Sequence, residues 1–114
     1  MIAVIFEFTA ADGRFADYKQ LAESLNEEVR RFDGVISIER FQSIGDPARF
    51  VSLSFWRDED AVRQWRNVQK HREAQAKGRH GIFSSYRLRV CSVIRDYGMK
   101  ERGEAPKDSV AVHG

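Results

Sequence analysis

The residue of this 114-residue chain best suited to proton transfer is His71. A neutral imidazole can accept a proton near neutral pH. Trp65, Val68, His71 and Gln75 follow one another at intervals of three or four residues, so a helix would place them on one side. We expect that side to face the core, because the opposite side would carry Arg63, Arg66, Lys70 and Glu73. The spacing predicts His71 as a general base; the alternative is a half-exposed helix histidine.

Residues that could form a pocket beside His71 are spread over the whole chain. Trp65 would form one wall, and Gln75 and Arg79 would be its polar ends. Cavities for flat ligands are lined mainly by aromatic side chains with a few polar groups. We therefore predict substrate-binding roles for these three residues and for four further aromatic residues, Phe6, Trp56, Phe83 and Tyr86. The alternative is that the aromatic residues are ordinary core, because such side chains dominate small cores.

The other reactive residues fit structural roles better. Glu7 lies on a predicted central strand, where a buried carboxylate must be paired or neutral, and Arg40, Arg87 or Arg89 could pair with it. An acid–base role for Glu7 is the alternative. Cys91 is expected to be a packed thiol. The sequence has no ligand spacing typical of zinc and no glycine-rich phosphate loop, so we expect no cofactor.

Hydrophobic periodicity predicts six elements in the order strand, helix, strand, strand, helix, strand. Their expected ranges are Ile2–Thr9, Phe15–Phe32, Val35–Ile44, Ala48–Trp56, a helix capped by Asp58 and ended by Gly78, and Tyr86–Tyr97. This order is the split βαβ pattern, an α+β fold of the ferredoxin-like βαββαβ type with a four-stranded antiparallel sheet. We expect one domain over residues 1–98. Residues 99–114 would be a polar tail, either mobile or an arm lying across a partner subunit.

The predicted strands carry apolar residues on both faces. Both helices should cover one face, so the other would expose a large apolar patch, which monomers avoid. Packing two such faces about a twofold axis predicts a homodimer. The net charge of +2 without a basic stripe argues against nucleic acid. The apolar run Ile2–Phe8 is too short to span a membrane, and one cysteine fits a reducing compartment, so we expect a cytoplasmic protein.

Three stretches of the sequence resemble the antibiotic biosynthesis monooxygenase family. They are the opening MIAVIFEF, the segment SLSFWRDEDAVRQWRNVQKHREAQAKGR and the closing strand YRLRVCSVIRDYG. The middle stretch is the most specific, because it combines a strand ending in an aromatic residue, an acidic helix start, Trp65, His71 and the residues from Gln75 to Arg79. The resemblance implies a dimeric α+β barrel.

The family resemblance also implies chemistry, because the family has two well-defined branches. One branch contains cofactor-independent monooxygenases that oxidise phenols or quinols with oxygen alone. The other degrades haem, and this chain departs from its pattern: Glu7 stands where that branch has asparagine, and the spacing from Trp65 to His71 is about one turn too short. We therefore expect a monooxygenase acting on a small aromatic or quinol substrate. The alternatives are a non-catalytic dimeric scaffold that binds a small hydrophobic ligand and, less favoured, a haem-degrading enzyme.

Overall fold

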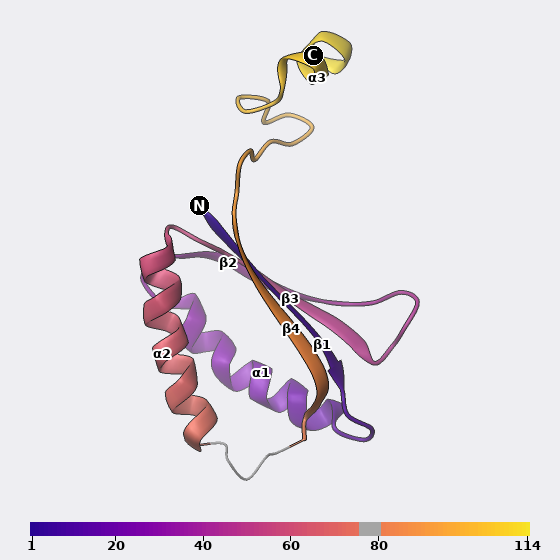
Figure 1. Ribbon diagram of the computed structural model, residues 1–114, viewed down its shortest axis with the longest axis vertical. Helices are drawn as coiled ribbons and strands as arrows, with labels where there is room; N and C mark the ends of the chain where they lie inside the picture. The colour runs from indigo at the N-terminus through magenta and orange to yellow at the C-terminus, as the bar shows by residue number, and fades with distance from the viewer. Residues whose placement is uncertain (76–80) are drawn as a thin grey trace.

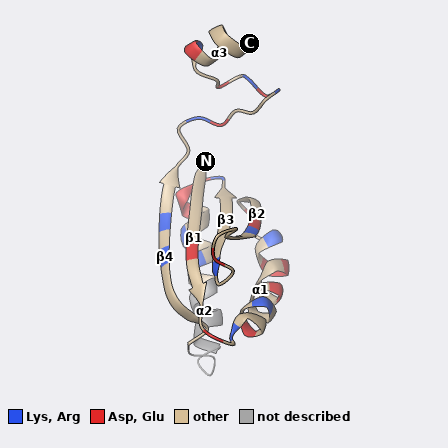
Figure 2. Cartoon of the chain, turned by 90° about the vertical axis from the view of Figure 1, so that its right-hand side faces the viewer, with Lys and Arg blue, Asp and Glu red and all other residues tan. Residues whose placement is uncertain are grey.

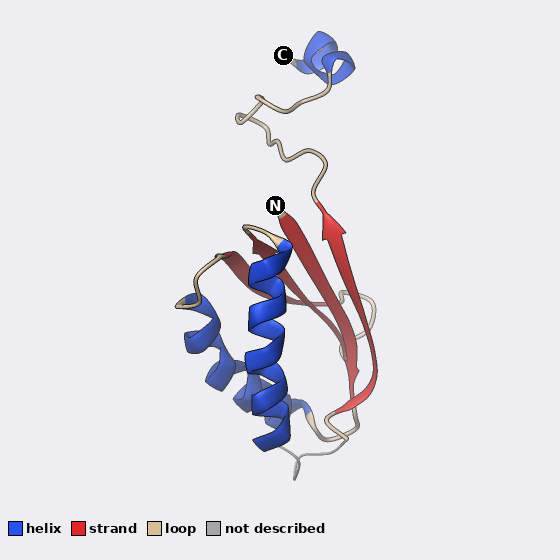
Figure 3. Cartoon of the chain, turned by 60° about the vertical axis from the view of Figure 1, so that its left-hand side comes forward, coloured by secondary structure: helices blue, strands red, loops and turns tan. Residues whose placement is uncertain are grey.

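The computed structural model describes residues 1–75 and 81–114, without the side chains of residues 69–75. The elements are β1 (Ile2–Ala10), α1 (Phe15–Arg30), β2 (Val35–Gln42), β3 (Arg49–Trp56), α2 (Glu59–Gln75), β4 (Phe83–Ser92) and α3 (Lys107–His113). The strands form one antiparallel sheet in the order β2-β3-β1-β4, and α1 and α2 lie on the same side of it (Figures 1 and 3). The predicted α+β fold of the ferredoxin-like type is confirmed.

The alternation of side chains along the strands divides the sheet into two faces as predicted. Phe8 of β1, together with Phe50 and Trp56 of β3, is buried on the side of the helices. Two buried clusters form there. One contains Phe8, Ala10, Tyr18, Phe50 and Ile82, and the other contains Val29, Trp56, Ala61, Val62 and Trp65. We call the opposite side the open face, because neither helix covers it.

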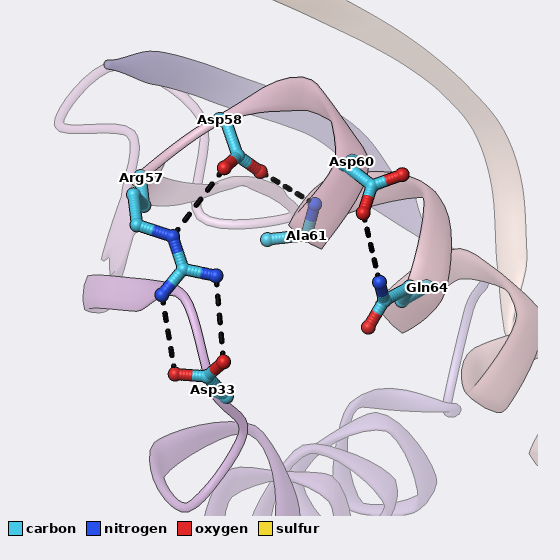
Figure 4. Close-up of polar contacts among 6 residues, drawn as sticks. All are labelled: Asp33, Arg57, Asp58, Asp60, Ala61 and Gln64. Carbon is cyan, nitrogen blue, oxygen red and sulfur yellow. Dashed lines mark hydrogen bonds and ion pairs between the residues drawn. The ribbon is translucent and has the colours of Figure 1, made fainter.

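The start of α2 is fixed by a group of polar contacts (Figure 4). As predicted, Asp58 caps the helix: its Oδ1 accepts a hydrogen bond of 2.8 Å from the backbone N–H of Ala61. This hydrogen bond is the main reason why the pKa of Asp58 lies below 3.8. Arg57 donates to Asp58 and, through both terminal nitrogens, to Asp33 at 3.2 and 3.4 Å. These contacts join the start of α2 to the segment that follows α1.

Gly34 lies at the same junction and leaves no room for a side chain. Its φ of +101° belongs to the left-handed region, and a Cβ built on it would lie 2.5 Å from the Cβ of Ala61. Its carbonyl accepts a hydrogen bond of 2.8 Å from the backbone N–H of Arg57. The close approach of Gly34 and Ala61 therefore sets the lateral position of α2 over the sheet.

The last strand differs from the prediction of Tyr86–Tyr97. It begins earlier because Ala10 of β1 pairs with Phe83, and it ends earlier because Ser92 pairs with Ile2, the first residue of β1. Beyond this point β1 offers no further partner except the carbonyl of Met1, which accepts a hydrogen bond from the N–H of Val93. The length of the neighbouring strand therefore decides the length of β4.

Residues 93–114, which we call the C-terminal arm, project away from the sheet (Figure 1). Around Arg102 the arm folds on itself. The guanidinium donates to the carbonyl oxygens of Gly98 and Gly114 and to Ser109 Oγ, and it lies 5.4 Å from the ring centroid of Tyr97. Helix α3 was not predicted from the sequence, and none of its residues is buried.

Among the described residues, no helix has the length and apolar character needed to cross a membrane. The cytoplasmic location and the absence of a nucleic-acid partner stay predictions.

Candidate functional site

Three predicted site residues, Phe6, Phe83 and Tyr86, contact one another on the helix side of the sheet. The ring centroid of Phe6 lies 5.5 Å from the ring centroid of Phe83 and 5.5 Å from that of Tyr86. Phe6 also stacks on Phe8, which belongs to the core. The side chain of Tyr86, in contrast, is 68% exposed. The group therefore runs from the core outward to solvent.

The exposed aromatic ring of Tyr86 continues into an apolar surface along β4. Val4 pairs with Val90 and Phe6 with Leu88, so both β4 side chains point to the helix side of the sheet. Nevertheless, Leu88 is 52% exposed and Val90 is 44% exposed. We call Phe6, Phe83, Tyr86, Leu88 and Val90 the β4 surface. Figure 3 shows the reason for the exposure: β4 is a sheet edge, and the helices lie over the other strands.

A cavity of about 260 Å³ lies between α2 and the Val90 end of the β4 surface. Val62 and Val90 form its apolar walls, one from the helix and one from the strand. The remaining lining residues are charged and all come from the first two turns of α2: Glu59, Asp60, Arg63 and Arg66. The arrangement offers a small molecule an apolar surface on one side and charged groups on the other.

Trp56 and Trp65 lie together, but in the core. The indole Nε1 of Trp56 donates to Ser54 Oγ at 2.9 Å, and both residues are buried. Trp65 packs against Phe32 and Trp56, with ring centroids 5.4 and 6.3 Å away. The two indoles therefore pack beneath α2, where they hold the helix against the sheet.

The predicted inner stripe of α2 is partly wrong. Trp65 is buried as expected, but Val68 is 36% exposed, whereas Ala61 and Val62, which precede Trp65 on the helix, are only 2% and 7% exposed. The helix is therefore turned so that positions 61, 62 and 65 meet the core.

Glu7 lies on the open face, away from the β4 surface. Its carboxylate accepts from Arg89 at 3.1 Å and from Arg49 at 3.2 Å. The pairing with Arg89 was predicted, whereas Arg49 was missed and Arg40 instead donates to Asn26. Figure 2 views this face, with the acidic position of β1 between basic positions. Glu7 cannot reach a ligand on the helix side, so its structural role as an ion pair is the one that fits.

A second cavity, of about 350 Å³, lies at the opposite end of β1 and was not foreseen. It is lined mainly by small residues together with Phe15 and Phe50, whose rings stack at 5.3 Å. The ring of Tyr18 lies 5.9 Å from that of Phe50, and its buried hydroxyl has no hydrogen-bond partner among the described residues. Burial raises the pKa of this hydroxyl, and the charge of Arg40 opposes the shift. Among the described residues, no group of three or more histidine, cysteine or acidic side chains could hold a metal ion.

Comparison with known proteins decides the family. The sequence profile described as "Antibiotic biosynthesis monooxygenase" matches residues 1–77. The chain belongs to the antibiotic biosynthesis monooxygenase family. It is 43% identical over 93 residues to the "Jasmonate monooxygenase ABM" of Pyricularia oryzae; the match covers 82% of this chain and 43% of that protein. The chain thus spans less than half the length of this relative.

Solved structures show the same fold at low sequence identity. Rv0793 from Mycobacterium tuberculosis superposes with a TM-score of 0.73 at 16% identity, covering 85% of this chain and 98% of that one. SnoaB, a cofactor-independent oxygenase from Streptomyces nogalater, gives 0.69 at 14% identity, covering 83% and 94%.

Three of the site residues predicted for this family member cannot be placed from the described side chains. His71 and Gln75 belong to α2, but their side chains lie outside the described residues, and Arg79 lies outside them altogether. Their roles stay predictions. The residues that the sequence analysis missed are Val62, Leu88, Val90 and Arg66. Leu88 and Val90 share the alternating pattern of buried strand residues, so only the position of the helices distinguishes them.

Proposed function

We propose that this family member is a monooxygenase that oxidises a small aromatic or quinol molecule bound between α2 and β4, with oxygen and no added cofactor. The observation that carries the proposal is the β4 surface, where aromatic and aliphatic side chains on the helix side of the sheet stay exposed beside a cavity. A planar apolar molecule would cover this surface and would itself be shielded from water.

His71 is the proposed base. It would take the proton of a phenolic or quinol hydroxyl and leave an electron-rich anion for oxygen to attack. The substrate supplies the electrons: in the oxidation of a CH2 group between two aromatic rings to a ketone, one oxygen atom enters the product and the other leaves as water with the two hydrogens. Gln75 and Arg79 are the proposed polar ends of the site, and Trp56 and Trp65 form its support.

The name of the Pyricularia relative suggests a second class of test substrate. That protein is named for jasmonate, a small carboxylic acid without an aromatic ring. Assays should therefore compare an anthrone bearing phenolic hydroxyls, a simple quinol and jasmonate.

Oxygen consumption by the purified protein, without flavin, metal or haem, tests the proposal. We expect turnover of the anthrone or quinol, and a loss of about a hundredfold or more in His71→Ala. His113→Ala is the matched control, because His113 is an exposed histidine of the C-terminal arm. Ligand binding without oxygen consumption would instead support the binding scaffold. A Soret band on titration with haemin, followed by haem breakdown, would support the haem branch.

We also propose that the chain is a homodimer joined through the open face. Ile5, Val51, Leu53 and Phe55 are only partly buried there, and Phe41 is exposed. Ile5→Asp should dissociate the dimer, because it would bury a charge at the centre of the interface. Ile44→Asp is the matched control, since Ile44 is fully exposed in the turn between β2 and β3. A monomeric wild type in sedimentation experiments at micromolar concentration would contradict the proposal.

A further inference from the structure

The cavity between α2 and β4 is lined by one arginine, Arg66, whose charge is not paired among the described residues. Its guanidinium has no hydrogen bond or ion pair within the part of the chain that the structure describes. Arg63, the other arginine of the cavity, forms an ion pair with Asp60, which also accepts from Gln64 Nε2 at 2.9 Å. Arg66 is therefore available to a ligand.

The position of Arg66 suits a ligand that is partly apolar. Val62 and Arg66 are four residues apart, so they lie on the same side of α2, and Val62 faces the cavity together with Val90. A guanidinium presents five donors and no acceptor, in a fork that matches an acid group. Glu59 also lines the cavity, and its carboxylate is the one there without a partner among the described residues. It lies seven residues before Arg66, about 10 Å along the helix axis.

We propose that Arg66 selects substrates that are small hydrophobic anions, with the apolar body on the β4 surface and the acid group on the guanidinium. This inference rests on the proposed function only for the location of the substrate. A neutral molecule covering the same surface would remove water from Arg66 without offering an acceptor, which is unfavourable. A carboxylate, sulfonate or acidic phenolate would replace that water with a charge-assisted hydrogen bond.

Two fluorescent probes that differ by one acid group provide the test. 8-Anilinonaphthalene-1-sulfonate and N-phenyl-1-naphthylamine share the same ring system, and only the first carries a sulfonate. We expect the wild type to bind the sulfonate more tightly. Arg66→Gln should weaken sulfonate binding about tenfold, as expected for loss of a hydrogen bond to a charged group, and should leave binding of the neutral probe within about twofold.

Two variants control for charge and for location. Arg66→Lys should keep part of the preference for the sulfonate. Arg95→Gln should leave it unchanged, because it removes the same charge from an exposed position of the C-terminal arm. Equal affinity of Arg66→Gln and wild type for the sulfonate, or equal losses for both probes, would overturn the inference. Because binding is measured without turnover, an inactive protein that keeps the preference would refute only the proposed monooxygenase activity.

Discussion

On the helix side of the sheet, the half formed by β1 and β3 and the half formed by β4 contain the same kinds of residue but differ in exposure to solvent. In β1 and β3, Phe8 and Trp56 are each only 2% exposed, whereas Tyr86 and Leu88 of β4 are more than half exposed. All four are large apolar side chains at alternating strand positions. The difference lies in the helices: Phe8 packs against Tyr18 of α1 and Trp56 packs against Trp65 of α2, whereas Tyr86 and Leu88 belong to neither buried cluster. Strand alternation decides which face a side chain joins, and the helix position decides whether it is buried.

The largest effect is expected for the covered half. Trp56→Ala should lower the free energy of unfolding by about 3–5 kcal/mol, because it leaves a cavity in the core and removes the partner of Ser54. Urea denaturation followed by circular dichroism measures this loss. A change below about 1 kcal/mol would mean that the core can collapse around the missing ring.

The second prediction concerns the position of α2. Gly34→Ala should cost about 1–3 kcal/mol, because alanine is strained at a positive φ and its Cβ would push Ala61 away. The same substitution at Gly45, where a Cβ meets nothing within 4 Å, is the matched control. If α2 shifts, ligand binding at the β4 surface should change as well. Unchanged binding would mean that the contact between Gly34 and Ala61 does not affect the β4 surface.

The cap of α2 should give a smaller, pH-dependent effect. Asp58→Ala should lower the melting temperature at neutral pH, because the N–H of Ala61 loses its acceptor. The pKa of Asp58 is lower in the folded state, so its contribution is fully present above the ordinary value of 3.8 and disappears as the pH falls below it. Melting curves of both proteins should therefore converge in acid. A constant difference across this range would contradict the role of the carboxylate.

The smallest effect on stability is expected for the uncovered half. Leu88→Ala should change the free energy of unfolding by less than about 1 kcal/mol, because half of the side chain is already in water. Binding of the two naphthyl probes should nevertheless weaken, since both would lose an apolar contact. A stability loss close to that of Trp56→Ala would mean that β4 is covered in solution.

Much of the fold could be predicted from the sequence because it depends on local patterns. Alternation along the predicted strands indicated apolar side chains on both sheet faces, and the acidic helix start indicated Asp58 as its cap. The order of strands and helices followed from the change of period between the segments. These features need no knowledge of distant contacts.

What the sequence did not predict depends on contacts between distant segments. The pairing of Glu7 with Arg49 depends on the register of β1 and β3, and the choice of Val62 over Val68 depends on how α2 is rotated. The exposure of Leu88 follows from the lateral position of α2. The sequence pattern places Arg66 on a solvated charged face of the helix. Whether its guanidinium is free to bind a ligand depends on the pairing of its neighbours, such as that of Arg63 with Asp60.

The contacts of Arg102 hold the C-terminal arm together within itself, so the arm should open and close independently of the sheet. One guanidinium joins Gly98, Ser109 and Gly114, so loss of that side chain would release both ends of the segment together. The arm has no buried residue in α3 to link its order to that of the sheet. Its amide protons should therefore exchange with solvent through local openings whose free energy is unrelated to global unfolding. Low concentrations of urea, which bring the sheet closer to unfolding, would leave these exchange rates almost unchanged.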